Sequence, residues 1–460
     1  MSMLGTAVIR KEDPALLTEG GRYVDDIVAT DALHAAFVRS PVAHGVIESI
    51  DISEAAAMPG VIGVFTAADL ELSATPPGMP MFNQTMLRTF LATERVRFVG
   101  EPVAVVVAES HAVAVDAVET VWADIEPLDA VISVHDALRD ETLLFPDAGT
   151  NTITQLPGSG DDVFADCDVT VELSFRNQRL APVPLESRAA VARWDTVDGV
   201  EHLTQWSENQ GAHGTRDGLA AALGIDASQV RVITPDVGGG FGAKNGLYPE
   251  DILVAMLARR LGQPVRWAET RSESMLGLVH GRGQEITATI GGTRDGRVLG
   301  LRTHVVQDGG AYPSVGSILP IFAKNLASGP YDIANVDVST VSVATNTVPV
   351  GAYRGAGRPE AAHIIERMMD AFATEIGLDP AEVRRTNFVA PDAFPYTNAS
   401  GTTMDSGNYA GALDTVLANV DYAALRAEQA RRRNDPDAKL LGLGWSAYIE
   451  ITNPVTSPDF

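Results

Sequence analysis

The sequence predicts an α+β protein in which short strands alternate with a small number of helices. Apolar runs rich in valine, such as PVAVVVA at 102–108, are typical of buried strands. Apolar residues that recur every four positions from Ile364 to Ile376 are typical of one face of a helix. The 460 residues, 45% of them hydrophobic, suffice for two to four domains of about 100 to 200 residues each.

The first third of the chain contains both kinds of element. β-branched and aromatic residues predict strands over three ranges: 33–40, 61–65 and 102–108. Ser53 is a good N-cap for a short helix that the MPG at 58–60 would end. A second helix over 110–122 would carry Val115, Val118 and Trp122 on one face. We therefore predict a first α+β domain over residues 1–140.

A linker is expected over 141–162, because DAGTN and LPGSGDD combine many turn-forming residues with few large apolar ones. The second domain then covers 163–460. Strands are predicted there over four ranges: 169–175, 189–194, 202–206 and 230–234. Helices are predicted over 209–223, ending at Gly224, from Pro249 to Gly262, and from Pro359 to Gly377.

Charge and cysteine content exclude several functions. Lysine and arginine total 34 against 60 aspartate and glutamate, and the net charge of −26 would repel a nucleic acid backbone. Cys167 is the only cysteine, so this chain cannot supply a four-thiolate iron–sulfur cluster or zinc site. The amino terminus lacks an apolar run long enough for a signal sequence, and no run elsewhere could span a bilayer. We expect a soluble, cytoplasmic protein.

The most glycine-rich point of the chain is PDVGGGFGAKN at 235–245. Without Cβ atoms, its glycines let backbone N–H groups approach an anionic or polar ligand closely. A P-loop is excluded, because Ala243 precedes Lys244 and Asn245 follows it where a serine or threonine is needed. GxGxxA at 238–243 leaves nicotinamide binding open, and a purely structural turn is a further alternative.

A second candidate is GAYRGAGRPEAA at 351–362, just before a predicted helix. Arg354 and Arg358 could hydrogen-bond a phosphate or a carbonyl, or could be two solvated arginines on a turn. Glu186 in APVPLESR could act as an acid or base, or could be structural. GxSxG and HExxH are absent, and the nine histidines do not show metal-ligand spacing.

Taken together, these segments resemble the molybdenum-binding large subunit of the xanthine oxidase and aerobic carbon monoxide dehydrogenase family. The similar stretches follow the family order over nearly the whole chain. They are GRYVDDI at 21–27, HAAFVRSPVAHGVIESID at 34–51, VGEPVAVVVA at 99–108, APVPLESR at 181–188, TQW at 204–206, GGGFGAKN at 238–245, AYRGAGRPEAA at 352–362 and GLDPAEVRRTNF at 377–388.

The resemblance implies a small α/β hammerhead domain followed by a molybdopterin-binding α+β domain. It implies a molybdenum–molybdopterin cofactor, as the cytosine dinucleotide or the mononucleotide form, whose metal takes no ligand from the protein. By motif position, Gln205 and Arg354 would be catalytic. The residues that would hold the cofactor are Gln205, Gly239, Gly240, Phe241, Gly242 and Arg354. The substrate pocket would contain Asn245, Phe322, Gly355 and Ala356.

The resemblance also implies a reaction, the hydroxylation of an electron-poor carbon with water as the oxygen source. Electrons would pass to partner subunits that carry FAD and [2Fe–2S] clusters. Gly355 stands where carbon monoxide oxidisers have a copper-bridging cysteine, so carbon monoxide is not expected as the substrate. Asn245 and Ala356 stand where xanthine oxidases have purine-binding residues. An aldehyde or an N-heterocycle is therefore the expected substrate.

The family carries its general-base glutamate in a further C-terminal half, which this sequence does not contain. We therefore expect that half on a separate chain of a split subunit, unless this chain is a truncated product. The alternative function is a non-catalytic scaffold that supplies part of the cofactor site.

Overall fold

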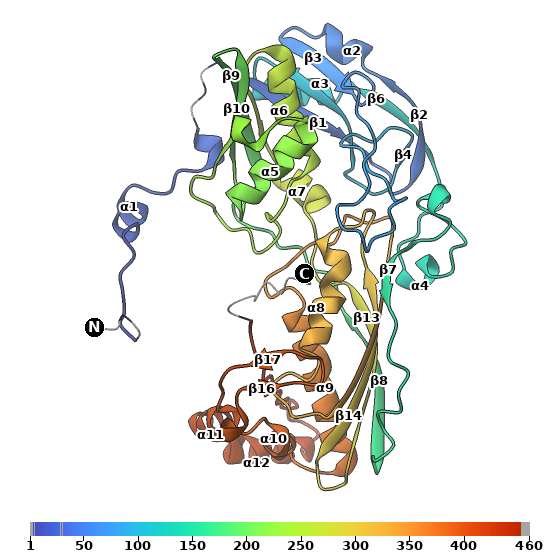
Figure 1. Ribbon diagram of the computed structural model, residues 1–460, viewed down its shortest axis with the longest axis vertical. Helices are drawn as coiled ribbons and strands as arrows, with labels where there is room; N and C mark the ends of the chain where they lie inside the picture. Colours follow the sequence, from blue (N-terminus) through green and yellow to red (C-terminus); the bar gives the residue numbers. More distant parts are fainter. Residues whose placement is uncertain (1–2, 4, 28, 30, 452–460) are drawn as a thin grey trace.

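A computed structural model describes residues 3, 5–27, 29 and 31–451. The chain is built on two large sheets that follow one another along its long axis (Figure 1). The upper sheet has seven strands and the lower sheet has five. The predicted α+β class is confirmed.

The seven-stranded sheet combines strands from two distant parts of the sequence, in the order β11-β10-β9-β12-β1-β5-β3. Its strands are β1 (Leu33–Arg39), β3 (Val61–Thr66), β5 (Pro102–Ala108), β9 (Ala189–Val197), β10 (Val200–Ser207), β11 (Val230–Ile233) and β12 (Val265–Ala268). The join is a parallel pairing of β1 with β12, in which Leu33 faces Val265. The first third of the chain therefore shares one sheet with residues 189–268.

Helices α5 (Ala212–Leu223) and α6 (Pro249–Leu261) pack on the part of this sheet formed by β9–β12. Proline occupies the first turn of α6, where its missing N–H costs no hydrogen bond, and Gly262 ends the helix in a left-handed conformation. Leu253 and Leu257 of α6 are fully buried in the largest core. Gly224 ends α5 in the same way, as predicted.

Helix α3 (His111–Val118) is shorter than the predicted 110–122. Its buried residues are Ala114 and Ala117, which let it lie close to β1 and β5, whereas Val115 is 38% exposed. Trp122 belongs instead to β6 (Trp122–Pro127) and is 70% exposed. Strands β4 (Arg95–Val96), β2 (Gly45–Asp51) and β6 form a small separate sheet, and α2 (Ser53–Ala57) lies next to α3.

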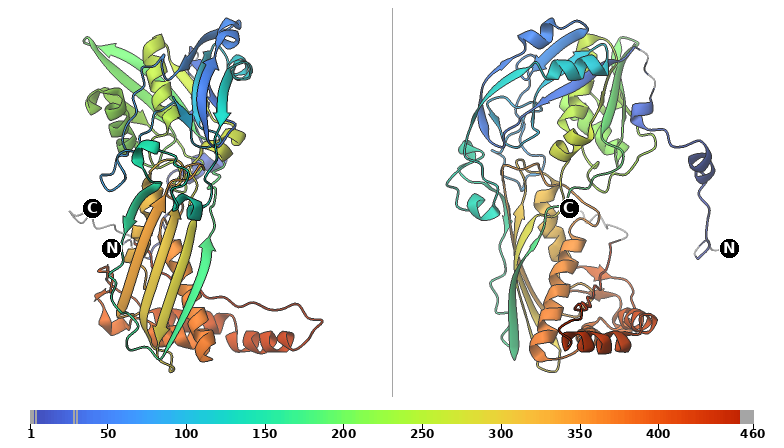
Figure 2. Two further views of the ribbon diagram at one scale, coloured as in Figure 1. Left: turned by 90° about the vertical axis from the view of Figure 1, so that its right-hand side faces the viewer. Right: turned by 180° about the vertical axis from the view of Figure 1, so that it is seen from behind.

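The five-stranded sheet has the order β7-β15-β14-β13-β8. Its strands are β7 (Thr152–Leu156), β8 (Val169–Asn177), β13 (Gln284–Gly292), β14 (Val298–Asp308) and β15 (Asn335–Val343). Helices α8 (Leu319–Asn325) and α9 (Arg358–Ile376) cover one face, and the other face is open to view in Figure 2 (left). The predicted stripe on α9 forms the core against this sheet, with Ile364, Met368 and Phe372 buried.

The segment predicted as a linker, 141–162, contains β7 and the buried side chains of Leu144 and Phe145. The domain limits 1–140 and 163–460 stay a prediction. The other elements are α1 (Asp13–Thr18), α4 (Val134–Ala137), α7 (Arg271–Gly277), α10 (Pro380–Asn387), α11 (Tyr409–Asn419), α12 (Tyr422–Arg433), β16 (Tyr396–Thr397) and β17 (Thr403–Met404), with short 3-10 turns between them. Within the described ranges, we find no helix with the length and apolarity that crossing a bilayer requires.

Candidate functional site

Two loops leave the seven-stranded sheet side by side. Strands β10 and β11 are parallel, so their carboxyl ends lie at the same edge of the sheet. Residues 208–210 follow β10, and the glycine-rich segment 234–248 follows β11; we call residues 235–245 the glycine loop. The backbone N–H of Gln210 donates to the carbonyl of Lys244 at 3.0 Å, which joins the two segments. Ligands of α/β sheets often bind beyond such strand ends.

Two glycine amides of the glycine loop are held by side chains. Gly238 N–H donates to Oε2 of Glu186 at 2.8 Å, and Gly242 N–H donates to Oε1 of Gln210 at 2.7 Å. In the described part of the chain, the amides between them, those of Gly239, Gly240 and Phe241, have no acceptor. Free consecutive amides of this kind form a concavity that favours an anion.

The AYRG segment, which we call the arginine loop (351–357), lies directly against the glycine loop. The backbone N–H of Arg354 donates to the carbonyl of Phe241 at 2.9 Å. A Cβ atom on Gly242 would lie 2.6 Å from the carbonyl oxygen of Ala352, so only glycine permits this approach. The structure therefore brings together the two motifs that the sequence analysis singled out.

Both loops hold a residue other than glycine in the left-handed region. The φ angle is +54° at Phe241 and +41° at Ala356. Such conformations cost about 1 to 3 kcal/mol each and are found preferentially at active sites and ligand clamps. The strain, on two loops that touch, marks this region as the candidate site.

The Arg354 side chain is exposed and makes no ion pair within the described residues. Its backbone is fixed by the buried Arg282, whose guanidinium donates to the carbonyl oxygens of Tyr353 at 2.7 Å and Arg354 at 2.8 Å. Arg282 is itself paired with Glu360 at 3.1 Å. The guanidinium of Arg354 is thus free for a ligand while its main chain is held.

The structure does not bring Gln205 to these loops. Gln205 lies within β10 with no exposed surface, and its Nε2 donates to the carbonyl of Asp251 at 3.2 Å, at the start of α6. Gln210 lies at the glycine loop instead, with Oε1 held by Gly242 and Nε2 available as a donor. The sequence analysis missed Gln210, although its position just beyond the carboxyl end of β10 was a usable signal.

The residues predicted for the substrate pocket occupy two places. Asn245 is exposed at the end of the glycine loop, and Gly355 and Ala356 are half-buried in the arginine loop. Phe322 lies in α8, where its Cβ would be 2.9 Å from a Cβ added at Gly357. Phe322 therefore contacts the last residue of the arginine loop at the start of α9, and its part in a substrate pocket stays a prediction.

Glu186 makes structural contacts within the glycine loop, which favours the structural role of the two that the sequence left open. Its Oε2 accepts from Gly238 N–H and from the fully buried Lys244 Nζ, both at 2.8 Å. Behind the loop, burial raises the pKa of Glu208, and the Asp251 carboxyl adds to the rise.

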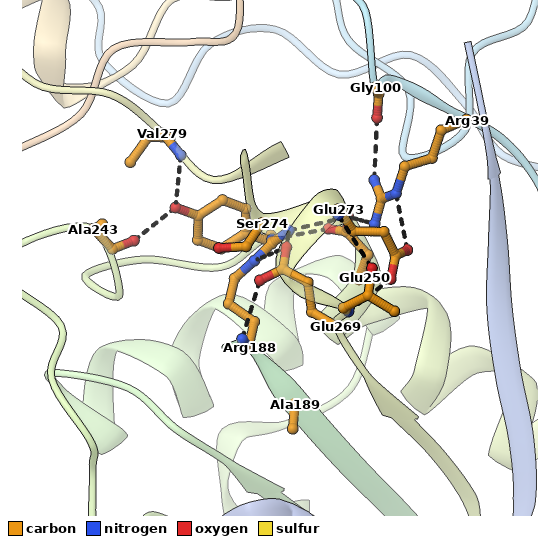
Figure 3. A network of polar contacts seen from close by, with 12 residues as sticks. Arg39, Gly100, Arg188, Ala189, Ala243, Glu250, Glu269, Glu273, Ser274 and Val279 are labelled. Atoms are coloured by element: carbon orange, nitrogen blue, oxygen red, sulfur yellow. Dashed lines mark hydrogen bonds and ion pairs between the residues drawn. The ribbon is translucent and has the colours of Figure 1, made fainter. Parts of the chain in front are cut away.

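A buried ionic network lies behind the loop and reaches into the first third of the chain (Figure 3). Arg188 pairs with Glu269 and, at 3.2 Å, with Glu250, and Glu250 also pairs with Arg39 of β1 at 2.9 Å. Burial is the largest influence on Glu250 and would raise its pKa, but the two guanidinium groups outweigh it and lower the pKa to about 2. Glu250 is therefore charged at neutral pH.

The donor set suits a cofactor that is rich in anionic oxygens and brings its own metal ligands. Three unpaired backbone amides, the Gln210 amide and one guanidinium can all donate hydrogen bonds to such a group. Nicotinamide binding by GxGxxA does not fit, because the motif opens no helix and α6 begins only at Pro249.

Comparison with known proteins agrees with this reading. Residues 18–129 match the family described as aldehyde oxidase and xanthine dehydrogenase, a/b hammerhead domain, and residues 144–388 match the molybdopterin cofactor-binding domain. The carbon monoxide dehydrogenase large chain of Hydrogenophaga pseudoflava is 39% identical over 96% of this chain and 57% of its own length. The nicotine 6-hydroxylase large subunit of Paenarthrobacter nicotinovorans is 34% identical over 99% of this chain and 56% of its own.

Among solved structures, quinoline 2-oxidoreductase from Pseudomonas putida 86 superimposes with a TM-score of 0.88 at 37% identity, covering 94% of this chain and 56% of that one. Fold and site are thus those of the molybdopterin-binding class, similar to the large subunits of its oxidoreductases. The chain belongs to the xanthine dehydrogenase and aldehyde oxidase family, together with the carbon monoxide dehydrogenase large chains. It spans slightly more than half the length of these relatives.

Proposed function

We propose that the chain forms one wall of the active site of a molybdenum hydroxylase and holds its molybdopterin cofactor at the two loops. The 2.9 Å hydrogen bond from Arg354 N–H to the Phe241 carbonyl carries this proposal, because it joins the loop of free amides to the loop that bears the Arg354 side chain. When bound, the cofactor supplies two-electron oxidation of an electron-poor carbon with oxygen taken from water.

The residues of this chain have distinct parts in the proposal. We propose that the cofactor is the cytosine dinucleotide form. Its oxygen atoms accept hydrogen bonds from the amides of Gly239, Gly240 and Phe241 and from Nε2 of Gln210. Arg354 stabilises negative charge that develops on the substrate in the transition state. Asn245, Gly355 and Ala356 line the substrate pocket. We also propose Phe322, which contacts Gly357 of the arginine loop, as part of this pocket. Gln205 supports the junction of β10 with α6 through its hydrogen bond to the Asp251 carbonyl.

We propose an N-heteroaromatic compound or an aldehyde as the substrate. Two relatives are named for nicotine and quinoline, both N-heteroaromatic compounds, and Gly355 provides no thiol for a copper ion.

We further propose that electrons leave to subunits carrying FAD and [2Fe–2S] clusters, because this chain has one cysteine, Cys167, which is distant in sequence from both loops. We also propose that the protein is located in the cytoplasm.

Elemental analysis of two preparations tests the proposal. The first is the chain alone, and the second is the chain with the subunits that copurify with it. We expect about one molybdenum per chain in the complex, release of a cytosine nucleotide on acid treatment, and dye reduction with quinoline or benzaldehyde. A complex without molybdenum contradicts the proposal. Molybdenum without turnover of either compound favours the non-catalytic scaffold.

A further inference from the structure

A second, buried connection joins the glycine loop to the arginine loop, and it passes through one hydroxyl group. Tyr248 lies between the glycine loop and α6, where it is the N-cap residue. Its hydroxyl donates to the carbonyl of Ala243 at 2.6 Å. The same hydroxyl oxygen accepts from the backbone N–H of Val279 at 3.3 Å.

Val279 begins a short segment that runs along the arginine loop. The next residue, His280, donates from its backbone N–H to the carbonyl of Pro349 at 3.2 Å and accepts from Gly351 N–H at 2.7 Å. A Cβ on Gly351 would lie 2.6 Å from Cγ2 of Val279. The two backbone hydrogen bonds of His280 therefore tie this segment to the start of the arginine loop, and only glycine at position 351 permits so close an approach.

The ring of Tyr248 is held independently of its hydroxyl. The Arg188 guanidinium lies over the ring, with Cζ 4.0 Å from its centre, and Arg188 is fixed by Glu250 and Glu269 (Figure 3). A cation over an aromatic face is attractive, and more so when both are removed from water. Burial raises the pKa of Tyr248, so the hydroxyl stays protonated and keeps its donor.

We propose that Tyr248 is a positioning residue that fixes the distance between the glycine loop and the arginine loop, through hydrogen bonds from one hydroxyl to Ala243 and Val279. Both hydrogen bonds of the hydroxyl go to backbone groups, so the proposal gives Tyr248 a positioning role and not a catalytic one. The functional part of the proposal rests on the proposed function, in which Arg354 and the amides of residues 239–241 must act on the same group.

Tyr248→Phe tests this role, because it removes the hydroxyl and keeps the ring over Arg188. Tyr396→Phe is the matched control: Tyr396 is also half-buried, and its hydroxyl donates to Asp332 at 2.9 Å in the lower half of the molecule. Amide hydrogen exchange is measured by peptide in both variants and in the unchanged protein, with circular dichroism to show that each is folded.

We expect Tyr248→Phe to accelerate exchange about fivefold in two peptides together, 238–246 and 349–356, with a change below about twofold elsewhere. Tyr396→Phe leaves both peptides unchanged. In the complex with its copurified subunits, Tyr248→Phe lowers kcat about tenfold while KM stays within about twofold, since the positioning acts in the transition state.

Unchanged exchange in either loop peptide, or an increase spread evenly over the chain, would overturn the proposal. A fall in kcat with no change in exchange would overturn it too, because the effect would then not pass through the loops. Loosened loops in a protein that never contains molybdenum would support the role of Tyr248 and overturn the proposed function, so the two failures are distinguishable.

Discussion

Lys244 and Glu186 form an ion pair of 2.8 Å in which the lysine side chain has no exposed surface. The same carboxylate oxygen accepts from Gly238 N–H, so one side chain fixes the two ends of the glycine loop. The other oxygen of Glu186 is buried without a partner among the described residues. We therefore expect the removal of either charge of this pair to destabilise the glycine loop more than a change of charge elsewhere in it.

Lys244→Met should destabilise the protein strongly, because it leaves the Glu186 carboxylate without its cation. Breaking a buried pair by removing one partner costs about 3 to 5 kcal/mol. The free energy of unfolding in urea measures the loss. Arg193→Met is the control, since Arg193 pairs with Asp195 at 3.0 Å on the surface and such pairs contribute about 0 to 1 kcal/mol. Equal losses in the two variants would contradict this prediction.

Gly242 and Gly246 provide a matched pair for the contact between the loops. Both have positive φ, +94° and +118°, so alanine is strained at either position. A Cβ at Gly242 meets the Ala352 carbonyl at 2.6 Å, whereas a Cβ at Gly246 meets nothing within 4 Å. We expect Gly242→Ala to lower the free energy of unfolding by about 2 kcal/mol more than Gly246→Ala. A smaller loss for Gly242→Ala would show that the loops separate freely.

His280 should make the stability pH-dependent. Burial, followed by the charge of Arg179, lowers the pKa of His280 to about 4. Below pH 6.5 the unfolded chain therefore binds a proton that the folded chain does not bind until about pH 4. This difference lowers the stability as the pH falls through that range, and the contribution disappears above pH 6.5.

Replacing His280 with glutamine should remove about 2 kcal/mol of the stability loss between pH 7 and pH 5, as measured by urea unfolding at each pH. His213→Gln, at an exposed position on α5, is the control for histidine replacement as such. If the His280→Gln protein and the unchanged protein have parallel pH profiles, His280 is protonated normally in the folded state.

Arg354→Met should slow turnover at least about tenfold in the complex, because the guanidinium stabilises charge that develops during the reaction. Arg354 is exposed and unpaired within the described residues, so the free energy of unfolding should not change. Arg294→Met, at an exposed turn between β13 and β14, should affect neither quantity. A variant at position 354 with full kcat would remove this arginine from the active site.

The local elements could be predicted closely because each has its own signal. Proline at the start and glycine at the end located α6 and α9, and apolar runs located β5 and β11. Trp122 was misplaced because the burial of α3 depends on two alanines rather than on its large residues. Helical periodicity continues past the true end of that helix, whereas burial against β1 and β5 does not.

The site could be predicted in part. The glycine loop and the arginine loop were found from their unusual residues, and the 2.9 Å bond between them joins residues far apart in the sequence. Gln210 was missed because TQW lies in the strand itself, while the amide that reaches the loop comes after the strand has ended. The ion pair between Arg39 and Glu250 could not be predicted, because the sequence around each residue does not indicate a partner so distant along the chain.

The pairing of β1 with β12 has a consequence for synthesis of the chain. Leu33 leaves the ribosome more than two hundred residues before its neighbour Val265. During that interval β1 can pair with β5, but its other edge has no complement and is available to any passing extended segment. The nascent amino-terminal part is therefore exposed to edge-to-edge association until β12 arrives, and its expression as an isolated fragment should favour aggregation.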